Sequence, residues 1–244
     1  MKILVTGGAG YVGSVLIPIL VDKGNFVKCL DRFFFGAEFL SQNKFHGKIE
    51  IIKDDIRWFD PTILNDVDCV LDLAALSNDP AGELNPKKTF EINHGGRCRV
   101  AKLSKEHGVK RYILASSASI YGQQDNVANE NSSVKPLTAY SKANHNAEID
   151  SILLNDDNFT VTALRFASIY GVSPRMRFDL VINTFIAQAI QKEKIQVFGG
   201  NQYRPFLNVE DAADSLIFAL EKNLTGIYNV VSENLTISEA SQRI

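Results

Sequence analysis

Short apolar runs alternate with longer stretches of mixed apolar and polar residues along most of the chain. The apolar runs predict β-strands, and the mixed stretches predict helices. Strands are expected at 2–6, 26–31, 49–53, 68–73, 110–116 and 159–165, and helices at 11–23, 86–107 and 138–154. Strands that are apolar almost throughout are typical of a parallel sheet covered on both faces. Because such strands and helices join through right-handed crossovers, the pattern predicts an α/β fold with a doubly wound parallel sheet.

The pattern changes after residue 171. A helix is expected at 179–192, a short strand at 195–198, a helix at 210–221 and a strand at 227–231. We interpret 1–171 as a first domain and 172–244 as a smaller lobe interleaved with it. Residues 236–244 resemble the start of a further helix, with Ser238 as its N-cap and Glu239 after it. We therefore expect the lobe to be incomplete at its C-terminus.

Composition and charge exclude several classes of protein. The chain has 244 residues, of which 45% are hydrophobic, and its formal net charge is −2. Its basic residues are scattered, so no polycation is present to bind nucleic acid or an anionic membrane. Its apolar segments are short and broken by charge, which predicts neither a signal peptide nor a membrane span. The expected location is cytoplasmic.

Cysteine and histidine are sparse. The cysteines stand at 29, 69 and 98 without a CxxC motif, and the histidines stand at 46, 94, 107 and 145. We expect the thiols to be small buried side chains. The histidines are not spaced as metal ligands, so the sequence predicts no structural metal.

A glycine-rich loop joins the first predicted strand to the first predicted helix. Gly7, Gly10 and Gly13 have the spacing GxxGxxG. The first allows a tight turn, the second lets a ligand approach the backbone, and the third allows the helix to pack closely on the strand. Free N–H groups at a helix N-terminus attract phosphate. The loop therefore predicts a site for the pyrophosphate of a dinucleotide.

An acidic residue at the end of the second predicted strand indicates which dinucleotide binds. Asp31 follows Gly13 by 18 residues. A carboxylate there accepts hydrogen bonds from the adenosine ribose and repels a 2′-phosphate, which favours NAD over NADP. Arg32 comes next, and its charge suits that phosphate. An NADP-linked reductase therefore remains an alternative.

Further motifs follow the later strands. Segment 116–122 reads SSASIYG, 136–144 reads PLTAYSKAN, 165–171 reads RFASIYG and 204–211 reads RPFLNVED. With the glycine loop and Asp31, these segments resemble the extended short-chain dehydrogenase/reductase family, in particular its NAD-dependent nucleotide-sugar epimerases and dehydratases. The resemblance runs from residue 1 to the end of the chain. It implies a Rossmann sheet with a smaller C-terminal α/β lobe that binds substrate.

The resemblance implies catalytic roles for Ser117 and Tyr140. In this family a tyrosine phenolate removes the proton of a sugar hydroxyl, a serine holds the same oxygen, and a nicotinamide takes the hydride. A phenol has an ordinary pKa of about 10, so its anion needs stabilisation near neutrality. The family's lysine, four residues after the tyrosine on the same helix face, supplies that charge.

This chain has Asn144 where the family has that lysine. Asparagine hydrogen-bonds ribose hydroxyls but carries no charge. Lys142 lies about 200° around a helix from Tyr140 and cannot replace the missing lysine. We therefore expect activity that is reduced, shifted to higher pH, or lost.

The resemblance also implies two sets of contact residues. Those expected around NAD are Gly7, Gly10, Tyr11, Val12, Gly13, Asp31, Arg32, Asp55, Ile56, Leu73, Ala74, Ala75, Asn93, Tyr140, Asn144, Phe166 and Ser168. Those expected around a nucleotide-diphosphate sugar are Asn78, Ser117, Ser119, Arg175, Asn183 and Arg204. Asp55 would accept from the adenine amino group, Asn93 would hold the neighbouring strand, and Arg204 would bind phosphate. For Arg175 and Arg177, surface salt bridging is an equal alternative.

These expectations combine into a functional hypothesis with alternatives. The sequence predicts an NAD-dependent nucleotide-sugar epimerase or dehydrogenase. A dehydratase is less favoured, because Ala118 and Ser119 offer no carboxylate beside Ser117. The alternative that Asn144 motivates is a non-catalytic regulatory subunit that binds NAD or a nucleotide sugar. By resemblance, we expect a homodimer through helices 86–107 and 138–154.

Overall fold

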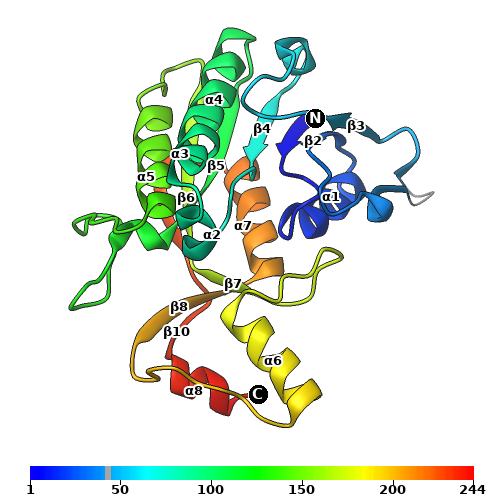
Figure 1. Ribbon diagram of the computed structural model, residues 1–244. Coiled ribbons are helices and arrows are strands. Elements are labelled where there is room, and N and C mark those ends of the chain that lie inside the picture. Colours follow the sequence, from blue (N-terminus) through cyan, green and yellow to red (C-terminus); the bar gives the residue numbers. More distant parts are fainter. Residues whose placement is uncertain (42–44) are drawn as a thin grey trace.

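A large parallel sheet forms the centre of the molecule. The computed structural model describes residues 1–41 and 45–244. Within them, seven parallel strands lie in the order β3-β2-β1-β4-β5-β6-β9 (Figure 1). They are β1 (Lys2–Thr6), β2 (Phe26–Asp31), β3 (Ile49–Lys53), β4 (Cys69–Asp72), β5 (Arg111–Ser117), β6 (Thr160–Phe166) and β9 (Gly226–Val230). The doubly wound α/β fold predicted from the sequence is confirmed.

The strand order reverses beside β1. The chain builds the sheet outward through β2 and β3, then returns to place β4 on the other side of β1 and continues through β5 and β6. In such sheets the loops that leave neighbouring strands in opposite directions open a crevice at the carboxyl ends of the strands. The fold therefore places a ligand crevice at the ends of β1 and β4.

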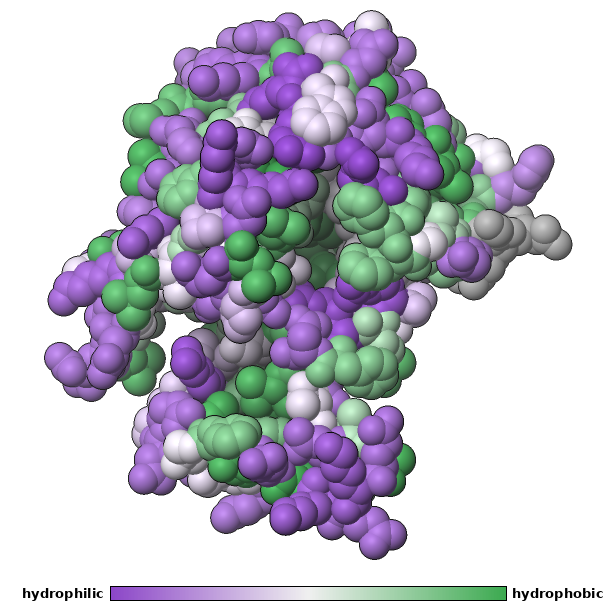
Figure 2. All heavy atoms as spheres, viewed as in Figure 1, coloured by the Kyte–Doolittle hydropathy of each residue, from purple (hydrophilic) through white to green (hydrophobic). Residues whose placement is uncertain are grey.

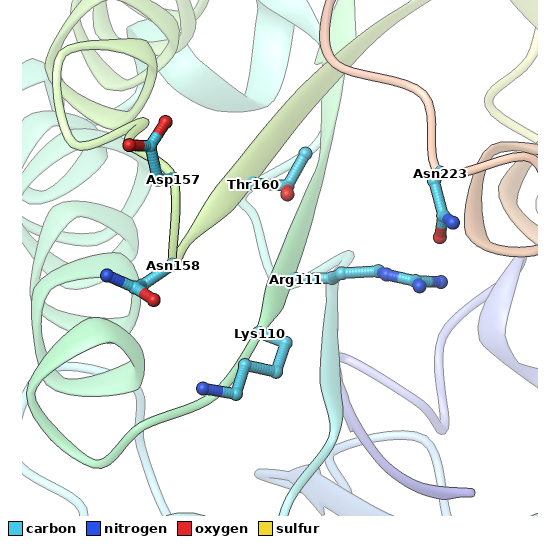
Figure 3. A pocket seen from close by; sticks show the side chains of 6 residues that line it. All are labelled: Lys110, Arg111, Asp157, Asn158, Thr160 and Asn223. Carbon is cyan, nitrogen blue, oxygen red and sulfur yellow. The ribbon is translucent and has the colours of Figure 1, made fainter.

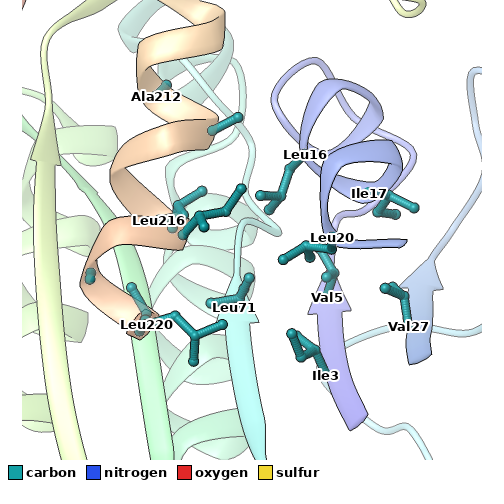
Figure 4. Packing of buried hydrophobic residues seen from close by; sticks show 14 of the residues in the cluster. Ile3, Val5, Leu16, Ile17, Leu20, Val27, Leu71, Ala212, Leu216 and Leu220 are labelled. Carbon is teal, nitrogen blue, oxygen red and sulfur yellow. The ribbon is translucent and has the colours of Figure 1, made fainter. Parts of the chain in front are cut away.

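Helices cover both faces of this sheet. On one face lie α1 (Gly13–Asp22) and α7 (Val209–Glu221), and on the other lie α3 (Pro86–Phe90), α4 (Arg97–Glu106) and α5 (Ala139–Ile152) (Figure 1). Figure 4 shows Leu16 and Leu20 of α1 and Leu216 of α7 meeting above Val5 of β1, and all four side chains are fully buried. Burial of each such side chain stabilises the fold by about 1.5–3 kcal/mol.

The helix predicted at 86–107 is formed over 86–106, but its middle turn has a different geometry. Between α3 and α4 the backbone forms a π-helical turn, η4 (Glu91–Gly96). Gly95 and Gly96 weaken an α-helix at this point. In addition, Ile56 packs so closely that a Cβ at Gly96 would lie 2.8 Å from its side chain. The predicted helix is therefore confirmed, and the π-helical turn within it coincides with the pair of glycines under a tight contact.

A smaller sheet follows the large one. It contains β7 (Ser168–Tyr170), β8 (Tyr203–Asn208) and β10 (Glu233–Thr236) in the order β10-β8-β7. Helices α6 (Val181–Lys192) and α8 (Ile237–Gln242) flank it, and Phe185 and Phe206 are buried between these elements. After β8 the chain returns to the large sheet through α7 and β9. The two parts of the fold are thus interleaved, whereas the boundary expected at residue 171 stays a prediction.

Two local expectations in this smaller part were wrong. Residues 195–198 form no strand, although Ile195 and Val197 still pack against its core. The strand begins at Tyr203, where pairing with β10 supplies the hydrogen bonds. Helix α8 begins two residues earlier than expected, because Thr236 rather than Ser238 is its N-cap and forms a capping box with Glu239.

The helices of residues 1–41 and 45–244 include none with the length and apolar character needed to span a bilayer.

Candidate active site

Residues from distant parts of the sequence meet at the carboxyl edge of the large sheet. Gly7 follows β1, Asp31 ends β2, Leu73 follows β4, Ser117 ends β5 and Phe166 ends β6. All five were predicted to lie at the cofactor or the reacting sugar. This edge faces the smaller sheet in Figure 1, and Figure 2 shows that the surface is hollowed between the two parts. The structure therefore brings the predicted residues to the place where α/β proteins bind ligands.

The glycine loop leaves no room for side chains. Gly7 has φ +66°, and a Cβ there would lie 2.8 Å from the backbone of Ala74. A Cβ at Gly13 would lie 2.5 Å from the carbonyl oxygen of Gly8. Helix α1 then begins with Val12 at its N-cap and without a side-chain cap. The N–H groups of Ser14 and Val15 donate to the carbonyl oxygens of Gly10 and Val12. Within the described residues, the N–H groups of Tyr11, Val12 and Gly13 have no protein acceptor, which fits a pyrophosphate at this turn.

Asp31 anchors the loop to the end of β2. Its Oδ2 accepts from the backbone N–H of Ala9 at 3.0 Å, and its Oδ1 accepts from that of Phe33 at 2.7 Å. Each carboxylate oxygen has a second lone pair, so Asp31 can still accept from a ribose hydroxyl. The neighbouring Arg32 instead donates to Asp55 at 3.0 Å.

Asp55 is surrounded by donors from its own chain. Its Oδ1 accepts from Arg57 N at 3.0 Å and Arg57 Nε at 2.9 Å, while its Oδ2 accepts from Arg57 Nη2 at 2.8 Å and Arg32 Nη1 at 3.0 Å. Burial by itself raises the pKa of Asp55, but the hydrogen bonds and charges of the arginines outweigh it and lower this pKa. An adenine amino group would have to displace one of these donors, so the expected adenine contact stays a prediction. The following Ile56 is buried against Gly96.

Asn93 fixes the loop after β4 through two hydrogen bonds to the backbone of Leu76. This fully buried side chain donates to the carbonyl oxygen of Leu76 at 2.9 Å and accepts from its N–H at 2.8 Å. The N–H of Ala74 donates to Thr6 Oγ1 at 3.2 Å. Ala74 and Ala75 therefore stay beside the glycine loop, and Asn93 fixes the segment that follows the neighbouring strand.

Tyr140 is positioned by the start of α5. Thr138 caps this helix in a capping box with Ser141. The N–H of Ala139 donates to Glu83 Oε1 at 2.5 Å, from the short helix α2 (Asp79–Glu83). A Cβ at Gly82 would lie 2.8 Å from the Cβ of Tyr140, so only glycine allows α2 to approach this closely. The tyrosine is thus fixed from two sides.

Ser117 lies beside the Tyr140 phenol. Burial raises the pKa of Tyr140 above its usual 10.0, whereas a hydrogen bond with Ser117 and the charge of Arg97 act to lower it. Ser117 Oγ also lies 3.0 Å from Ser119 Oγ. The two hydroxyl groups that were predicted to be catalytic therefore lie near each other, and the raised pKa of Tyr140 keeps the phenol protonated near neutrality.

Asn144 is buried and occupied by protein partners. Asn144 is only 1% exposed to solvent. Its Oδ1 accepts from Arg97 Nη1 at 2.7 Å, and its Nδ2 donates to the carbonyl oxygen of Tyr140 at 2.9 Å. Asn144 thus connects a guanidinium to the backbone of Tyr140. By contrast, Lys142 is exposed, as its place on the helix predicted.

Arg97 was missed by the sequence analysis. It is 1% exposed and belongs to α4, far from Tyr140 in the sequence. Its Nε donates to Asp72 Oδ2 at 3.3 Å, and its Nη2 donates to the carbonyl oxygens of Asp72 at 3.0 Å and Ala115 at 2.6 Å. Arg97 stands three and four residues before the buried Val100 and Ala101, on the same face of α4. This spacing could have revealed that Arg97 is buried.

The loop after β4 is also tied to the segment before α6. Asn78 has φ +129°, caps α2, and donates from Nδ2 to Asp179 Oδ2 at 2.6 Å. Arg177 donates to Ser77 Oγ at 2.9 Å and pairs with Asp179 at 2.5 Å. A non-glycine residue at such a φ is strained, and such strain clusters at functional sites. The Arg177 interactions match the salt bridging that was the alternative to a phosphate contact.

The other predicted substrate residues are dispersed. Asn183 is buried, where it donates to the Tyr11 hydroxyl at 3.0 Å and accepts from Gly171 N at 3.1 Å. The guanidinium of Arg175 lies 3.6 Å from the ring centroid of Phe35, beside the loop after β2 and therefore on the expected cofactor side. Arg204 is exposed on β8 and forms no ion pair within the described part of the chain. Their substrate contacts stay predictions.

A polar hollow lies at the opposite edge of the sheet. It encloses about 410 Å³ at the amino ends of β5 and β6, lined by Lys110, Arg111, Asp157, Asn158, Thr160 and Asn223 (Figure 3). Arg111 already donates to the carbonyl oxygen of Leu220 at 2.6 Å. The hollow is therefore separate from the site at the carboxyl edge.

The chain is similar to nucleotide-sugar enzymes throughout its length. UDP-glucuronic acid decarboxylase 4 of Arabidopsis thaliana is 32% identical over 241 residues, which cover 94% of this chain and 53% of the plant protein. The chain thus spans about half the length of the curated relatives it matches. A solved UDP-N-acetylglucosamine 4-epimerase from Methanobrevibacter ruminantium is 28% identical with a TM-score of 0.91, covering 99% of this chain and 80% of its own.

A second solved structure and a family model agree with this similarity. MoeE5, solved with UDP-glucose and NAD, is 26% identical with a TM-score of 0.85, covering 98% of this chain and 79% of its own. The model of the NAD dependent epimerase/dehydratase family matches residues 3–231. With its Rossmann sheet and glycine loop, the chain therefore belongs to the NAD dependent epimerase/dehydratase family.

Proposed function

We propose that this chain acts on a nucleotide-diphosphate sugar as an NAD-dependent epimerase or dehydrogenase. The observation that carries the proposal is that Ser117 and Tyr140 lie near each other at the carboxyl edge of the sheet, beside the glycine loop and the uncapped start of α1. The names of its relatives, which include UDP-glucuronic acid decarboxylases and a UDP-N-acetylglucosamine 4-epimerase, support a uridine nucleotide as the activating group.

Two features favour NAD over NADP as the cofactor. Asp31 stands at the end of β2 with lone pairs left for ribose hydroxyls, and its charge repels a 2′-phosphate. Arg32, the cation that would welcome that phosphate, is paired with Asp55. The solved relative MoeE5 contains NAD.

The side chains divide the chemistry between them. NAD, when bound, supplies the hydride acceptor for oxidation of a sugar carbon. The Tyr140 phenolate takes the proton of the hydroxyl on that carbon, and Ser117 hydrogen-bonds the same oxygen. Formation of the phenolate needs a nearby positive charge, and Arg97 is the buried cation that acts in this direction. We therefore include Arg97 as a positioning residue that acts through Asn144, in place of the family's lysine.

Calorimetry and turnover assays test this proposal together. Purified protein is titrated with NAD and with NADP, and then incubated with NAD and a panel of UDP-sugars while reduced nicotinamide and product configuration are followed. The Tyr140→Phe variant should still bind NAD in calorimetry but lose turnover by about 10²–10⁴-fold. The proposal is contradicted if neither NAD nor NADP binds.

A second candidate function rests on the uncharged Asn144. If NAD binds and no sugar in the panel reacts, the chain is a non-catalytic NAD- or nucleotide-sugar-binding subunit. Tighter binding of NADP than of NAD would instead indicate the reductase.

The expected homodimer and the cytoplasmic location also belong to this proposal. Ile149 and Leu153 lie exposed on and just after α5, at 45% and 77%, which supports burial of this face against a second copy. Sedimentation of the parent and of an Ile149→Glu variant tests the dimer, because a charge in the interface should give monomers.

A further inference from the structure

Three side chains with different donor atoms meet on the outer surface of the helices that cover the sheet. His94 belongs to the π-helical turn η4, Cys98 to the first turn of α4, and Asp150 to α5. His94 Nε2 lies 2.7 Å from Asp150 Oδ2, and Cys98 Sγ lies 3.6 Å from the same oxygen. All three donor atoms lie within 4.8 Å of one another. None of these residues belongs to the proposed catalytic site.

The local backbone explains how the group forms. His94 and Cys98 are four residues apart, so both side chains leave the same face of the continuous helical segment through η4 and α4. Helix α5 packs against this face and carries Asp150 across to it. Cys98 is 8% exposed, whereas the side chains of His94 and Asp150 are 30% and 47% exposed. In the single chain the group is therefore rooted in the protein and open on one side, and the homodimer proposed above would bring this side towards the second copy.

The donor set selects a class of metal. Calcium and magnesium prefer oxygen ligands and six or more of them, which an imidazole and a thiolate do not supply. Zinc binds nitrogen, sulfur and carboxylate oxygen together, usually with four ligands in a tetrahedron. We propose that His94, Cys98 and Asp150 form a zinc site whose fourth ligand is water, linking η4 and α4 to α5.

The donor atoms approach this coordination, and small side-chain movements complete it, because the His94 and Cys98 donor atoms, within 4.8 Å of each other, close by at most about 1 Å. Tetrahedral zinc with bonds of about 2.0–2.3 Å holds its ligand atoms about 3.3–3.7 Å apart. The 3.6 Å separation of Cys98 Sγ and Asp150 Oδ2 already matches. The imidazole and carboxylate, now hydrogen-bonded at 2.7 Å, must separate by somewhat less than 1 Å. Rotation of the half-exposed Asp150 side chain can supply this movement.

Charges around the group work in both directions. Lys102, one turn beyond Cys98, and Arg97 are cations whose charge acts on the thiol. The charge of Arg97 is offset by its ion pair with Asp72. The charge of Lys102 stands at the end of a long side chain. The zinc site would carry the charges of a thiolate and a carboxylate, which balance the two charges of the ion. A neutral coordinated unit therefore avoids repulsion by these cations.

The proposed ion would hold α5 against its neighbours. Tyr140 begins the same helix, so zinc bound at Asp150 would stabilise the element that carries the phenol without touching the reacting atoms. A metal that binds the folded chain but not the unfolded chain raises the free energy of unfolding in proportion to the logarithm of its concentration. The site thus predicts stability that depends on zinc and is independent of NAD.

Metal binding by the intact chain tests the proposal without any activity assay. Protein freed of metal with a chelator is dialysed against zinc and analysed for bound metal, and cobalt(II) is added separately as a spectroscopic probe. We expect one zinc per chain, and with cobalt the charge-transfer absorption of a thiolate ligand and the strong visible bands of a tetrahedral site. His94→Gln, Cys98→Ser and Asp150→Asn should each weaken zinc binding by about tenfold or more.

Matched variants keep the result interpretable. His107→Gln removes an exposed histidine, and Cys69→Ala removes a buried thiol from β4, so both should bind zinc as the parent does. Asp150→Asn changes a half-exposed side chain and is expected to fold even if Cys98→Ser does not. The proposal is overturned if the parent binds no zinc, if cobalt shows no thiolate absorption, or if Asp150→Asn binds zinc with the affinity of the parent.

Discussion

Replacement of Asn144 by lysine restores the YxxxK motif of the family, and the motif alone predicts a gain in turnover. The structure predicts a loss of stability instead. Asn144 is 1% exposed, and its Oδ1 accepts from Arg97 Nη1 at 2.7 Å. Lysine removes this acceptor and places a second positive charge beside a buried guanidinium.

The size of the effect follows from the burial of both groups. Two unit charges 4 Å apart repel by about 4 kcal/mol at an effective dielectric constant of about 20. Loss of a hydrogen bond to a charged group costs about 1.5–3 kcal/mol more. Deprotonation of the buried lysine limits the total loss of stability, because it removes the repulsion. We therefore expect the free energy of unfolding to fall by about 4 kcal/mol, which lowers Tm by about 8–16 °C.

Urea unfolding followed by circular dichroism measures this effect. The series contains the parent, Asn144→Lys, Arg97→Met and the double variant, with Asn146→Lys as the control. Asn146 is exposed on the same helix, so its replacement should change stability by no more than about 0.5 kcal/mol. The double variant should be more stable than the sum of the single effects predicts, because it removes the repulsion. If Asn144→Lys is as stable as the parent and turns over faster, the role given to Arg97 is wrong.

Three further outcomes follow from the same geometry. Burial holds the pKa of Tyr140 above 10.0, so the phenolate fraction grows as pH rises. The initial rate should therefore increase about tenfold per pH unit below that pKa. A rate that is flat from neutral to alkaline pH contradicts this. In Gly13→Ala the new Cβ would lie 2.5 Å from Gly8 O, and the resulting strain should weaken NAD binding by about tenfold or more in calorimetry. An affinity equal to that of the parent contradicts this. Glu148→Ala removes the carboxylate that lies 2.6 Å from the buried Arg165 guanidinium. The free energy of unfolding in urea should fall by about 3–5 kcal/mol, and a fall below about 1 kcal/mol would contradict this prediction.

Features that depend on neighbouring residues were predictable from the sequence. The glycine loop, Asp31 and the apolar strands identify themselves within short windows, because turn geometry and strand burial are local requirements. The proximity of Ser117 and Tyr140 was anticipated by resemblance to a family, and the parallel sheet explains it, since β5 ends at Ser117.

Features that depend on distant contacts were not predictable. The guanidinium of Arg97 meets Asn144 across two helices, and no local motif marks either residue as the partner of the other. Pairing with β10 decides where β8 begins, so the apolar run at 195–198 misled the strand assignment. The π-helical turn η4 needs both the glycine pair and the packing of Ile56, and only the first is visible in the sequence.

The Tyr11 hydroxyl joins the phosphate loop to the smaller part of the fold, because it donates to the carbonyl oxygen of Gly171 at 2.6 Å while accepting from Asn183 at 3.0 Å. Anyone who wishes to exchange sugar-recognition segments between relatives must therefore transplant this tyrosine and asparagine as a matched pair. A chimaera that breaks the pair would leave the buried Asn183 amide with only the carbonyl oxygen of Arg177 as its acceptor, and would separate the grafted segment from the glycine loop.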